Sequence, residues 1–253
     1  MFIRIAKDRK GLGKFAGSFA AEQLRSCLAS QDRARVLVAT GSSQFEVLEA
    51  LCEAGGIDWA RVDGFHLDEY VGLPRTHLAS FCGYLEERFV NQVPIGSFHF
   101  LDGQADPART ISQVSSIWAQ APIDVALIGI GENGHLAFND PPADFETKVV
   151  YHLVDLDLAC RRQQVGEGWF ANVDECPSRA ISMTIHAILQ SKCIVCSVPD
   201  QRKATAVAAS LQGPITCNVP GSILRNHSNV TLVLDKASAS MLGPEITAQA
   251  ISI

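Results

Sequence analysis

Short apolar runs alternate with amphipathic segments along the chain. Runs rich in Val, Ile, Leu and Phe predict strands at Val36–Ala39, Val62–Leu67, Phe98–Leu101, Val125–Ile128, Val149–Val154, Ile194–Val198 and Val230–Leu234. Apolar positions at helical spacing predict helices at Phe45–Cys52, about Thr76–Val90, Ala108–Ala119 and Arg202–Leu211. This alternation predicts an α/β fold with a doubly wound, mostly parallel, Rossmann-like sheet and helices on both faces.

No linker, internal repeat or low-complexity tract interrupts this alternation, so residues 1–253 are expected to form a single domain. In doubly wound sheets, ligands bind beyond the carboxyl ends of the strands. Polar clusters at those ends are therefore the candidates for chemistry. Three such clusters follow predicted strands, and a lysine follows a fourth strand.

Composition narrows the classes of partner. The formal net charge is -6 and no basic run is present, so nucleic acid is not an expected partner, whereas a few local cations can still hold one small anion. The N-terminus lacks a signal-peptide pattern and no stretch approaches ~20 apolar residues, so we expect a cytoplasmic protein without membrane association. The sequence leaves open whether the chain forms a homo-oligomer.

The eight cysteines are scattered through apolar segments, which is typical of reduced thiols in a protein core. Cys193-x-x-Cys196 resembles half of a metal or redox motif. It lies in an apolar run that predicts a buried strand, where residues three apart face opposite sides. No second such motif completes a zinc site, so core packing is the favoured interpretation and no metal is expected.

The first polar cluster is Thr40-Gly41-Ser42-Ser43, between a predicted strand and a predicted helix. Glycine permits a tight turn, and hydroxyls with free N–H groups at a helix start can bind an anion. An ordinary helix cap explains the same residues equally well. The second cluster is Asp68-Glu69, directly after the Val62–Leu67 strand. Carboxylates avoid burial unless they are paired or used, although a solvated pair in a loop is the alternative.

The third cluster runs from Gly129 to Pro142 and contains His135 and Asp140. Histidine can transfer protons near neutral pH, and a nearby carboxylate orients it. The segment also matches the dinucleotide fingerprint G-x-G-x-x-G, with Asp155 about twenty residues further on. That fingerprint requires a helix to open from the glycines, which Pro141-Pro142 opposes, so no nucleotide cofactor is expected. Lys203 opens the helix after the Ile194–Val198 strand, where it could bind a phosphate or simply be solvated.

Two of these segments resemble a known family. Asp68–Leu73 resembles the Asp-Glu-Tyr-Val-Gly-Leu signature of the glucosamine-6-phosphate deaminases, which share their fold with the 6-phosphogluconolactonases. Gly129–Pro141 is similar to their Gly-x-Gly-x-Asp-Gly-His-Ile-Ala-Phe-Asn-Glu-Pro signature. The continuation Ala137–Asn139 favours a deaminase over a lactonase. The resemblance covers about Val36–Asp235.

The resemblance implies a role for each matching residue. Asp68 would move a proton between C2 and C1 of the sugar, and His135 would open the pyranose ring. The residues implied to bind the phosphate or the rest of the substrate are Thr40, Gly41, Ser42, Ser43, Glu69, Gly134 and Lys203. No metal or cofactor is implied.

The chain departs from the signature at two positions. Asn133 replaces an aspartate, so stabilisation of a protonated His135 must come from Asp140 or Glu132, and Asp140 itself is one methylene shorter than the glutamate of the family. An asparagine before Gly-His also occurs in galactosamine-type relatives. The substrate-binding arginine of the family corresponds to Arg161 or Arg162, or to neither if that pair is a solvated helix surface.

The expected function is therefore isomerisation and deamination of a hexosamine 6-phosphate, with glucosamine 6-phosphate as the first substrate to test. Three alternatives stay open: a galactosamine-type deaminase, a 6-phosphogluconolactonase, and a sugar-phosphate-binding protein that has lost catalysis. A nicotinamide-dependent oxidoreductase is the remaining reading of Gly129–Gly134.

Overall fold

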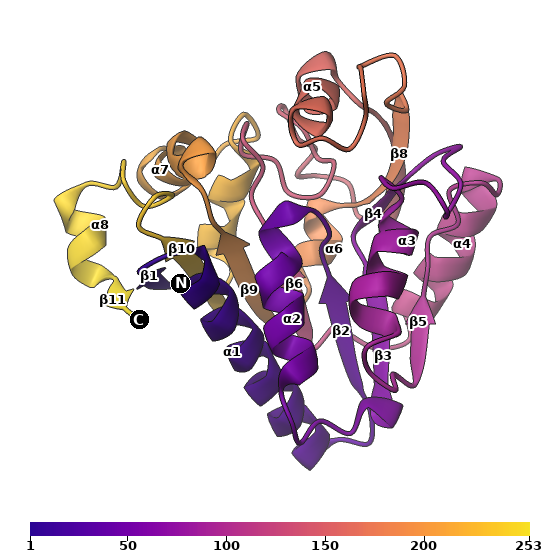
Figure 1. Cartoon of the computed structure of the whole chain (residues 1–253), viewed down its shortest axis with the longest axis horizontal. Helices are drawn as coiled ribbons and strands as arrows, with labels where there is room; N and C mark the ends of the chain where they lie inside the picture. Colours follow the sequence, from indigo (N-terminus) through magenta and orange to yellow (C-terminus); the bar gives the residue numbers. More distant parts are fainter.

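The computed structural model describes all residues from Met1 to Ile253. Eight strands form the central sheet, in the spatial order β11-β1-β10-β9-β6-β2-β3-β5, and every pairing between them is parallel (Figure 1). Their bounds are β1 Phe2–Ala6, β2 Ala34–Val38, β3 Val62–His66, β5 Ser97–His99, β6 Val125–Ile128, β9 Cys193–Val198, β10 Val230–Asp235 and β11 Ile251–Ser252.

A second, smaller sheet of three antiparallel strands lies beside the carboxyl ends of the central sheet. Its order is β4-β8-β7, with β4 at Asp68–Tyr70, β7 at Tyr151–Asp155 and β8 at Arg179–Met183. The helices are α1 Arg9–Ser30, α2 Phe45–Glu53, α3 Phe81–Leu85, α4 Pro107–Trp118, α5 Leu158–Gly166, α6 Ile185–Leu189, α7 Ala204–Gln212 and α8 Pro244–Gln249.

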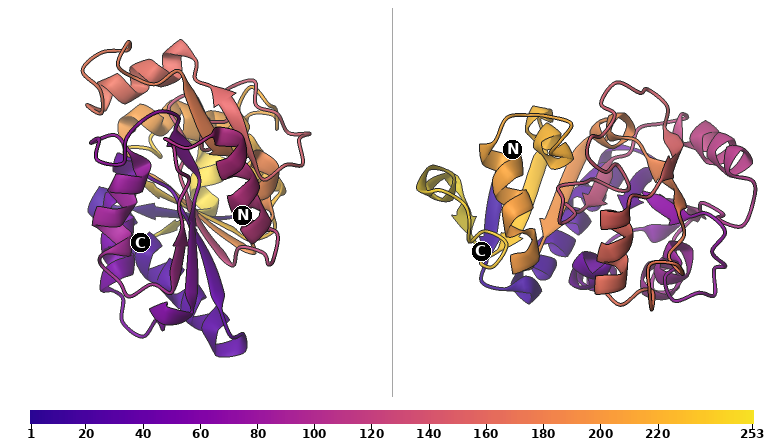
Figure 2. Two further views of the ribbon diagram at one scale, coloured as in Figure 1. Left: turned by 90° about the vertical axis from the view of Figure 1, so that its right-hand side faces the viewer. Right: turned by 90° about the horizontal axis from the view of Figure 1, so that it is seen from above.

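Alternation along the strands buries both faces of the central sheet. On β2, Val36 and Val38 pack into the core beneath α1 and α2, whereas Leu37 packs into the core on the opposite face. That opposite core also contains residues of α4, α6 and α7 (Figures 1 and 2). The parallel, doubly wound fold predicted from the sequence is confirmed.

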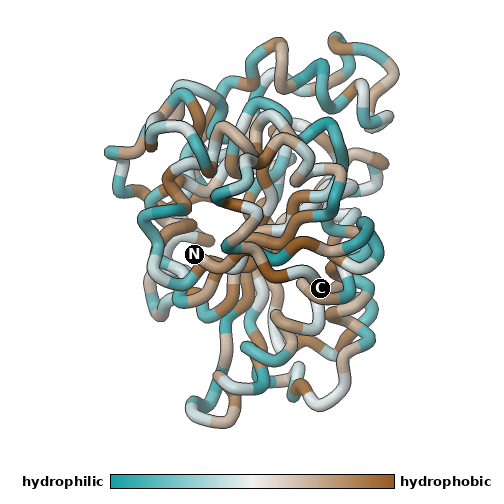
Figure 3. The backbone as a smooth tube through the Cα atoms, turned by 90° about the vertical axis from the view of Figure 1, so that its left-hand side faces the viewer, coloured by the Kyte–Doolittle hydropathy of each residue, from teal (hydrophilic) through white to brown (hydrophobic).

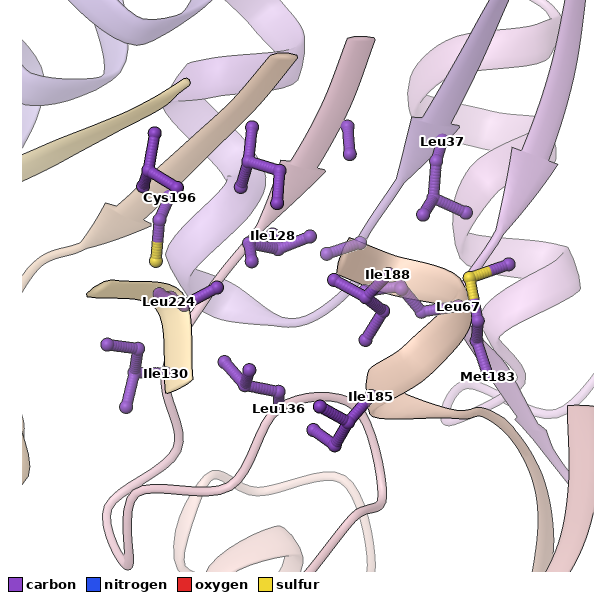
Figure 4. Packing of buried hydrophobic residues seen from close by; sticks show 14 of the residues in the cluster. Leu37, Leu67, Ile128, Ile130, Leu136, Met183, Ile185, Ile188, Cys196 and Leu224 are labelled. Atoms are coloured by element: carbon purple, nitrogen blue, oxygen red, sulfur yellow. The ribbon is translucent and has the colours of Figure 1, made fainter. Parts of the chain in front are cut away.

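The apolar residues gather in the strands at the centre of the molecule, and polar residues dominate the loops around them (Figure 3). Leu37, Ile128 and Cys196 come from three neighbouring strands and point to the same side, towards Leu136 and Ile188 (Figure 4). Cys193 belongs to the core on the other face, so the two cysteines of the Cys-x-x-Cys motif lie on opposite sides of β9, as the strand interpretation predicts.

Two predicted elements need correction. The helix predicted at Thr76–Val90 begins only at Phe81, because the Ser80 side chain caps it by accepting from the N–H of Gly83, and its last turn, Glu86–Val90, is a π-helix. The strand predicted at Val149–Val154 lies at Tyr151–Asp155 and belongs to the small antiparallel sheet. No helix is long and apolar enough to cross a membrane.

Candidate active site

A pocket opens at the carboxyl ends of the central strands. Its walls come from the segments after β2, β3, β6 and β9 and from α5, which lies above these strand ends (Figure 1). Of the residues singled out in the sequence, those that line the pocket are Thr40, Gly41, Ser42, Ser43, Asp68, His135 and Lys203. Side chains from four separate segments of the chain therefore face one space.

The turn from Thr40 to Ser43 is held in place from outside the pocket. Gly41 has a φ of 88°, a left-handed conformation that glycine adopts readily. Its carbonyl accepts a hydrogen bond from the Tyr84 hydroxyl at 3.1 Å, and the guanidinium of Arg9 donates to the carbonyl of Ser42. A fixed turn of hydroxyls at a helix start is suited to an anion.

Asp68 is the first residue of β4 and is only 7% exposed. Its carboxyl group makes no hydrogen bond within the protein and faces the pocket. Burial raises the pKa of Asp68 to about 8, and the negative charge of the neighbouring Glu69 adds to the effect. A carboxyl group with such a pKa can take up and return a proton near neutral pH.

His135 pairs with Asp140 behind the pocket wall, with 3.1 Å between Nδ1 and Oδ1. Asn133 joins the two: its amide nitrogen donates to Asp140 at 2.9 Å, and its amide oxygen accepts from the backbone N–H of His135 at 3.1 Å. Burial would raise the pKa of Asp140, but the contacts with His135 and Asn133 outweigh it and lower that pKa. Asp140 is thus the carboxylate that lies beside His135, whereas Glu132 lies 3.6 Å from Arg202 instead.

Gly131 packs closely against the imidazole of His135. A Cβ at this position would lie 2.3 Å from Cε1 and Nε2 of His135, so only glycine lets the ring lie flat against the loop. The glycine at this position of the segment therefore makes room for the histidine ring. The next regular element after β6 is the strand β7 and not a helix, and Asp155 is an exposed residue at the end of β7. The interpretation of Gly129–Gly134 as a dinucleotide-binding fingerprint is therefore wrong.

Two residues that we predicted to bind substrate lie outside the pocket. The carboxylate of Glu69 points to the other side of β4, where it accepts hydrogen bonds from the Ser80 hydroxyl and from three backbone N–H groups, those of Tyr70, Phe81 and Cys82. Gly134 has a φ of 88° and its carbonyl accepts from the N–H of Gly221. Both residues shape the loops that carry Asp68 and His135, and neither faces the pocket.

Lys203 is 7% exposed and its ammonium lies 4.0 Å from a carboxylate oxygen of Glu167. Burial lowers the pKa of Lys203, and the charge of Glu167 opposes that shift. Glu167 stands at the end of α5 and also accepts hydrogen bonds from Gln163 and from the indole of Trp169. The cation at this end of the pocket is therefore paired with a carboxylate supplied by α5.

The pocket-lining residues of α5 were missed in the sequence. Gln163, Gln164 and Glu167 line the pocket, whereas the two arginines beside them do not. Arg161 donates to the carbonyls of Val173 and Cys176, and Arg162 is exposed. The available signal was a polar Gln164 one helical turn after the apolar Cys160, on what is the buried face of the helix.

No group of three or more His, Cys, Asp or Glu side chains is placed to hold a metal ion. The pocket instead brings together a buried carboxyl group, an imidazole, a lysine and a turn suited to an anion, at the carboxyl edge of a parallel sheet. These features define a class of α/β proteins that act on small anionic ligands. The chain belongs to the glucosamine-6-phosphate isomerase/6-phosphogluconolactonase family, whose model matches residues 7–233.

Individual relatives agree with this assignment. A glucosamine-6-phosphate deaminase of Streptococcus pneumoniae (strain 70585) is 35% identical over 227 residues, which cover 89% of this chain and 94% of the relative. The structure of a monomeric glucosamine-6-phosphate deaminase has a TM-score of 0.87 at 27% identity and covers 96% of this chain and 100% of its own. A putative 6-phosphogluconolactonase from Neisseria gonorrhoeae FA 1090 has a TM-score of 0.74 at 21% identity, covers 93% and 100% of the two chains, and shows the shared fold.

Proposed function

We propose that this protein converts glucosamine 6-phosphate and water into fructose 6-phosphate and ammonia. One observation carries the proposal: the unpaired carboxyl group of Asp68 and the imidazole of His135 face the same pocket, which also holds Lys203 and the Thr40–Ser43 turn. The similarity to deaminases over most of the chain supports the same substrate class. No cofactor takes part in the proposed reaction.

Binding begins with the phosphate. The ammonium of Lys203 and the hydroxyl and N–H groups of the Thr40–Ser43 turn would hold it. Because the phosphate is remote from the reacting carbons, its binding orients the sugar towards Asp68 and His135. Nδ1 of His135 faces Asp140 at 3.1 Å, so Nε2 is the nitrogen that would meet the substrate. It would take the proton of the C1 hydroxyl and return it to the ring oxygen, which opens the ring.

Isomerisation then needs one carboxylate. Asp68 would accept the proton from C2 while the C1 carbonyl oxygen takes up a proton, which gives an enolamine. Asp68 then returns its proton to C1 as the nitrogen gives up one proton, which balances the proton gained by the oxygen and leaves an imine at C2. Water adds to that imine, the C2–N bond breaks, and nitrogen departs as ammonia while C2 becomes the ketone carbon. The low exposure of Asp68 suits this step, because a proton held by a buried carboxyl exchanges slowly with solvent.

The test is incubation with glucosamine 6-phosphate, followed by measurement of ammonia and fructose 6-phosphate. Asp68→Asn should lower turnover by at least about 10³-fold, since the amide cannot accept the C2 proton. Asp155→Asn, on the exposed end of β7, is the matched control and should leave turnover unchanged. A wild-type protein inert towards both glucosamine and galactosamine 6-phosphates would refute the proposal, and hydrolysis of 6-phosphogluconolactone by that protein would establish the lactonase alternative.

The proposal also includes the location of the protein in the cell and its binding partner. We propose a cytoplasmic location, because all eight cysteines are free thiols, which is typical of proteins in a reducing compartment. A phosphorylated hexosamine is the only partner that the pocket requires.

A further inference from the structure

Gln164 is a buried polar residue that the reaction described above does not use. It lies on the inward face of α5, one helical turn after Cys160, and is 7% exposed. It lines the same pocket as Asp68 and His135. Its side-chain amide makes no hydrogen bond with any protein group, although its backbone carbonyl accepts from the N–H of Trp169.

The neighbouring amide of α5, that of Gln163, has hydrogen-bond partners within the protein. The amide nitrogen of Gln163 donates to Glu167 at 2.9 Å, and its oxygen accepts from the N–H of Glu132. The polar atoms of the Gln164 side chain are not sealed inside the protein, so a molecule in the pocket can reach them. An amide that points into a pocket without a protein partner is left to hydrogen-bond water or a ligand.

The chemistry of the pocket limits which part of a ligand this amide can meet. Lys203 and the Thr40–Ser43 turn account for the phosphate at C6, and Asp68 and His135 account for C1 and C2. The carbons between these ends carry hydroxyl groups, each of which donates and accepts. A neutral amide, with one acceptor and one donor group, matches hydroxyls and has no charge to attract a phosphate.

We infer that Gln164 is a specificity-determining residue that hydrogen-bonds the C3 and C4 hydroxyl groups of the bound hexose phosphate. The inference rests on the proposed function, because it takes a C6 phosphate and a C1–C2 reacting end as given. Since C4 is the carbon at which glucosamine and galactosamine differ, the amide is placed to distinguish the two epimers. A site built to hydrogen-bond a hydroxyl discriminates more strongly than an apolar wall does.

The test compares two unreactive ligands on wild type and on Gln164→Leu. Glucitol 6-phosphate carries the C3 and C4 hydroxyls but no carbonyl, and glycerol 3-phosphate carries a phosphate without that chain. Calorimetric titration should show the affinity of the variant for glucitol 6-phosphate about tenfold lower or more, and its affinity for glycerol 3-phosphate unchanged. If the wild type is active, the ratio of its kcat/KM values for glucosamine 6-phosphate and galactosamine 6-phosphate should move closer to one in Gln164→Leu. The change should appear in KM.

Thermal unfolding supplies the readout that a merely structural residue would not give. Removing an unpaired amide should leave the midpoint of Gln164→Leu equal to wild type or above it, whereas Gln163→Leu, which breaks two hydrogen bonds, should lower it. A lower midpoint for Gln164→Leu together with equal losses for both ligands would overturn the inference, as would unchanged affinity for glucitol 6-phosphate. Absence of deamination by a wild type that still shows these binding differences would count against the proposed function alone.

Discussion

At the scale of single residues, the site depends on a carboxyl group that the fold keeps protonated. The pKa of Asp68 is raised to about 8 by burial and by Glu69, so at neutral pH most of the free protein carries a neutral carboxyl there. Only the carboxylate can accept the C2 proton. We therefore expect kcat/KM to rise with pH and to level off above an apparent pKa near 8. A pH–rate profile that is flat between pH 6 and 9 would contradict this assignment.

The same shift has a consequence for stability, with a fixed sign. An unfolded aspartate has a pKa of about 3.9, so between about pH 4 and pH 8 the folded state binds more protons at Asp68 than the unfolded state does. The contribution of this residue to stability therefore falls as the pH rises through that range. Asp68→Asn should raise the thermal midpoint at pH 8, and the gain over wild type should shrink as the pH approaches 4. A gain that is equal at both pH values would show that charge is not its cause.

Asn133 and Asp140 form a matched pair. The amide of Asn133 donates to Asp140 and accepts from the N–H of His135, whereas an aspartate there would place a second carboxylate 2.9 Å away. We expect Asn133→Asp and Asp140→Glu each to lower kcat/KM by about tenfold or more, and the double variant, which restores the family signature, to lose less than the sum. Additive losses in kcat/KM across the four proteins would indicate two independent positions.

Strand geometry explains which residues could be predicted. Asp68 and Glu69 are adjacent in a strand, and adjacent side chains point to opposite faces, so only one of them could enter the pocket. The sequence motif contains both, and nothing in it says which face is which. Asp68 and His135 were singled out by their strand-end positions together with the resemblance of their motifs to the family signatures, whereas the hydrogen bonds of Glu69 come largely from Ser80 and the first residues of α3, eleven to thirteen residues further on.

At the scale of elements, α5 extends from the Lys203 end of the pocket to the wall above it. Glu167, at the end of this helix, lies 4.0 Å from the ammonium of Lys203, where a phosphate would otherwise be the counterion. Glu167→Gln removes a competing negative charge and should strengthen binding of inorganic phosphate by about three- to tenfold at pH 7. Titration calorimetry at two salt concentrations measures this, with the exposed Glu175→Gln as control. Weaker binding in Glu167→Gln would mean that the carboxylate holds Lys203 in position instead.

The longest helix, α1, was not predicted from the sequence, for a physical reason. The face of α1 that packs against α2 consists of small residues: a Cβ on Gly13 would lie 2.2 Å from Cβ of Glu46, and one on Gly17 would lie 2.5 Å from the carbonyl of Val47. A search for large apolar residues at helical spacing does not detect such a face. Strands β2, β3, β6, β9 and β10 of the central sheet were predictable because continuous apolar runs are typical of strands buried on both sides. The partly exposed strands β1 and β11 were missed.

At the scale of the whole molecule, the two sheets share one hydrophobic core. Tyr151, Ile181 and Met183 of the small sheet belong to the same cluster as Leu37 and Ile128 of the central sheet. The hydroxyl of Tyr151 also donates to the carbonyl of His66 at the end of β3, with 2.8 Å between the oxygens. The small sheet also has a cluster of its own, which includes Tyr70 and Ala180, but Tyr151, Ile181 and Met183 join it to the core of the central sheet. We therefore propose that residues 1–253 fold as a single domain.

This proposal predicts one cooperative unfolding transition. Calorimetric and van't Hoff enthalpies should agree, and Ile181→Ala, in the small sheet, should lower the midpoint by about 5 to 10 °C because it empties a buried position in the shared core. Val149→Ala, half-exposed just before β7, should change it little. The far-ultraviolet signal, dominated by the helices on the central sheet, should shift with the midpoint of Ile181→Ala, since loss of the small sheet exposes the core beneath it. A separate early transition in that variant, with the central sheet still folded, would divide the chain into two units and place Asp68 on the weaker one.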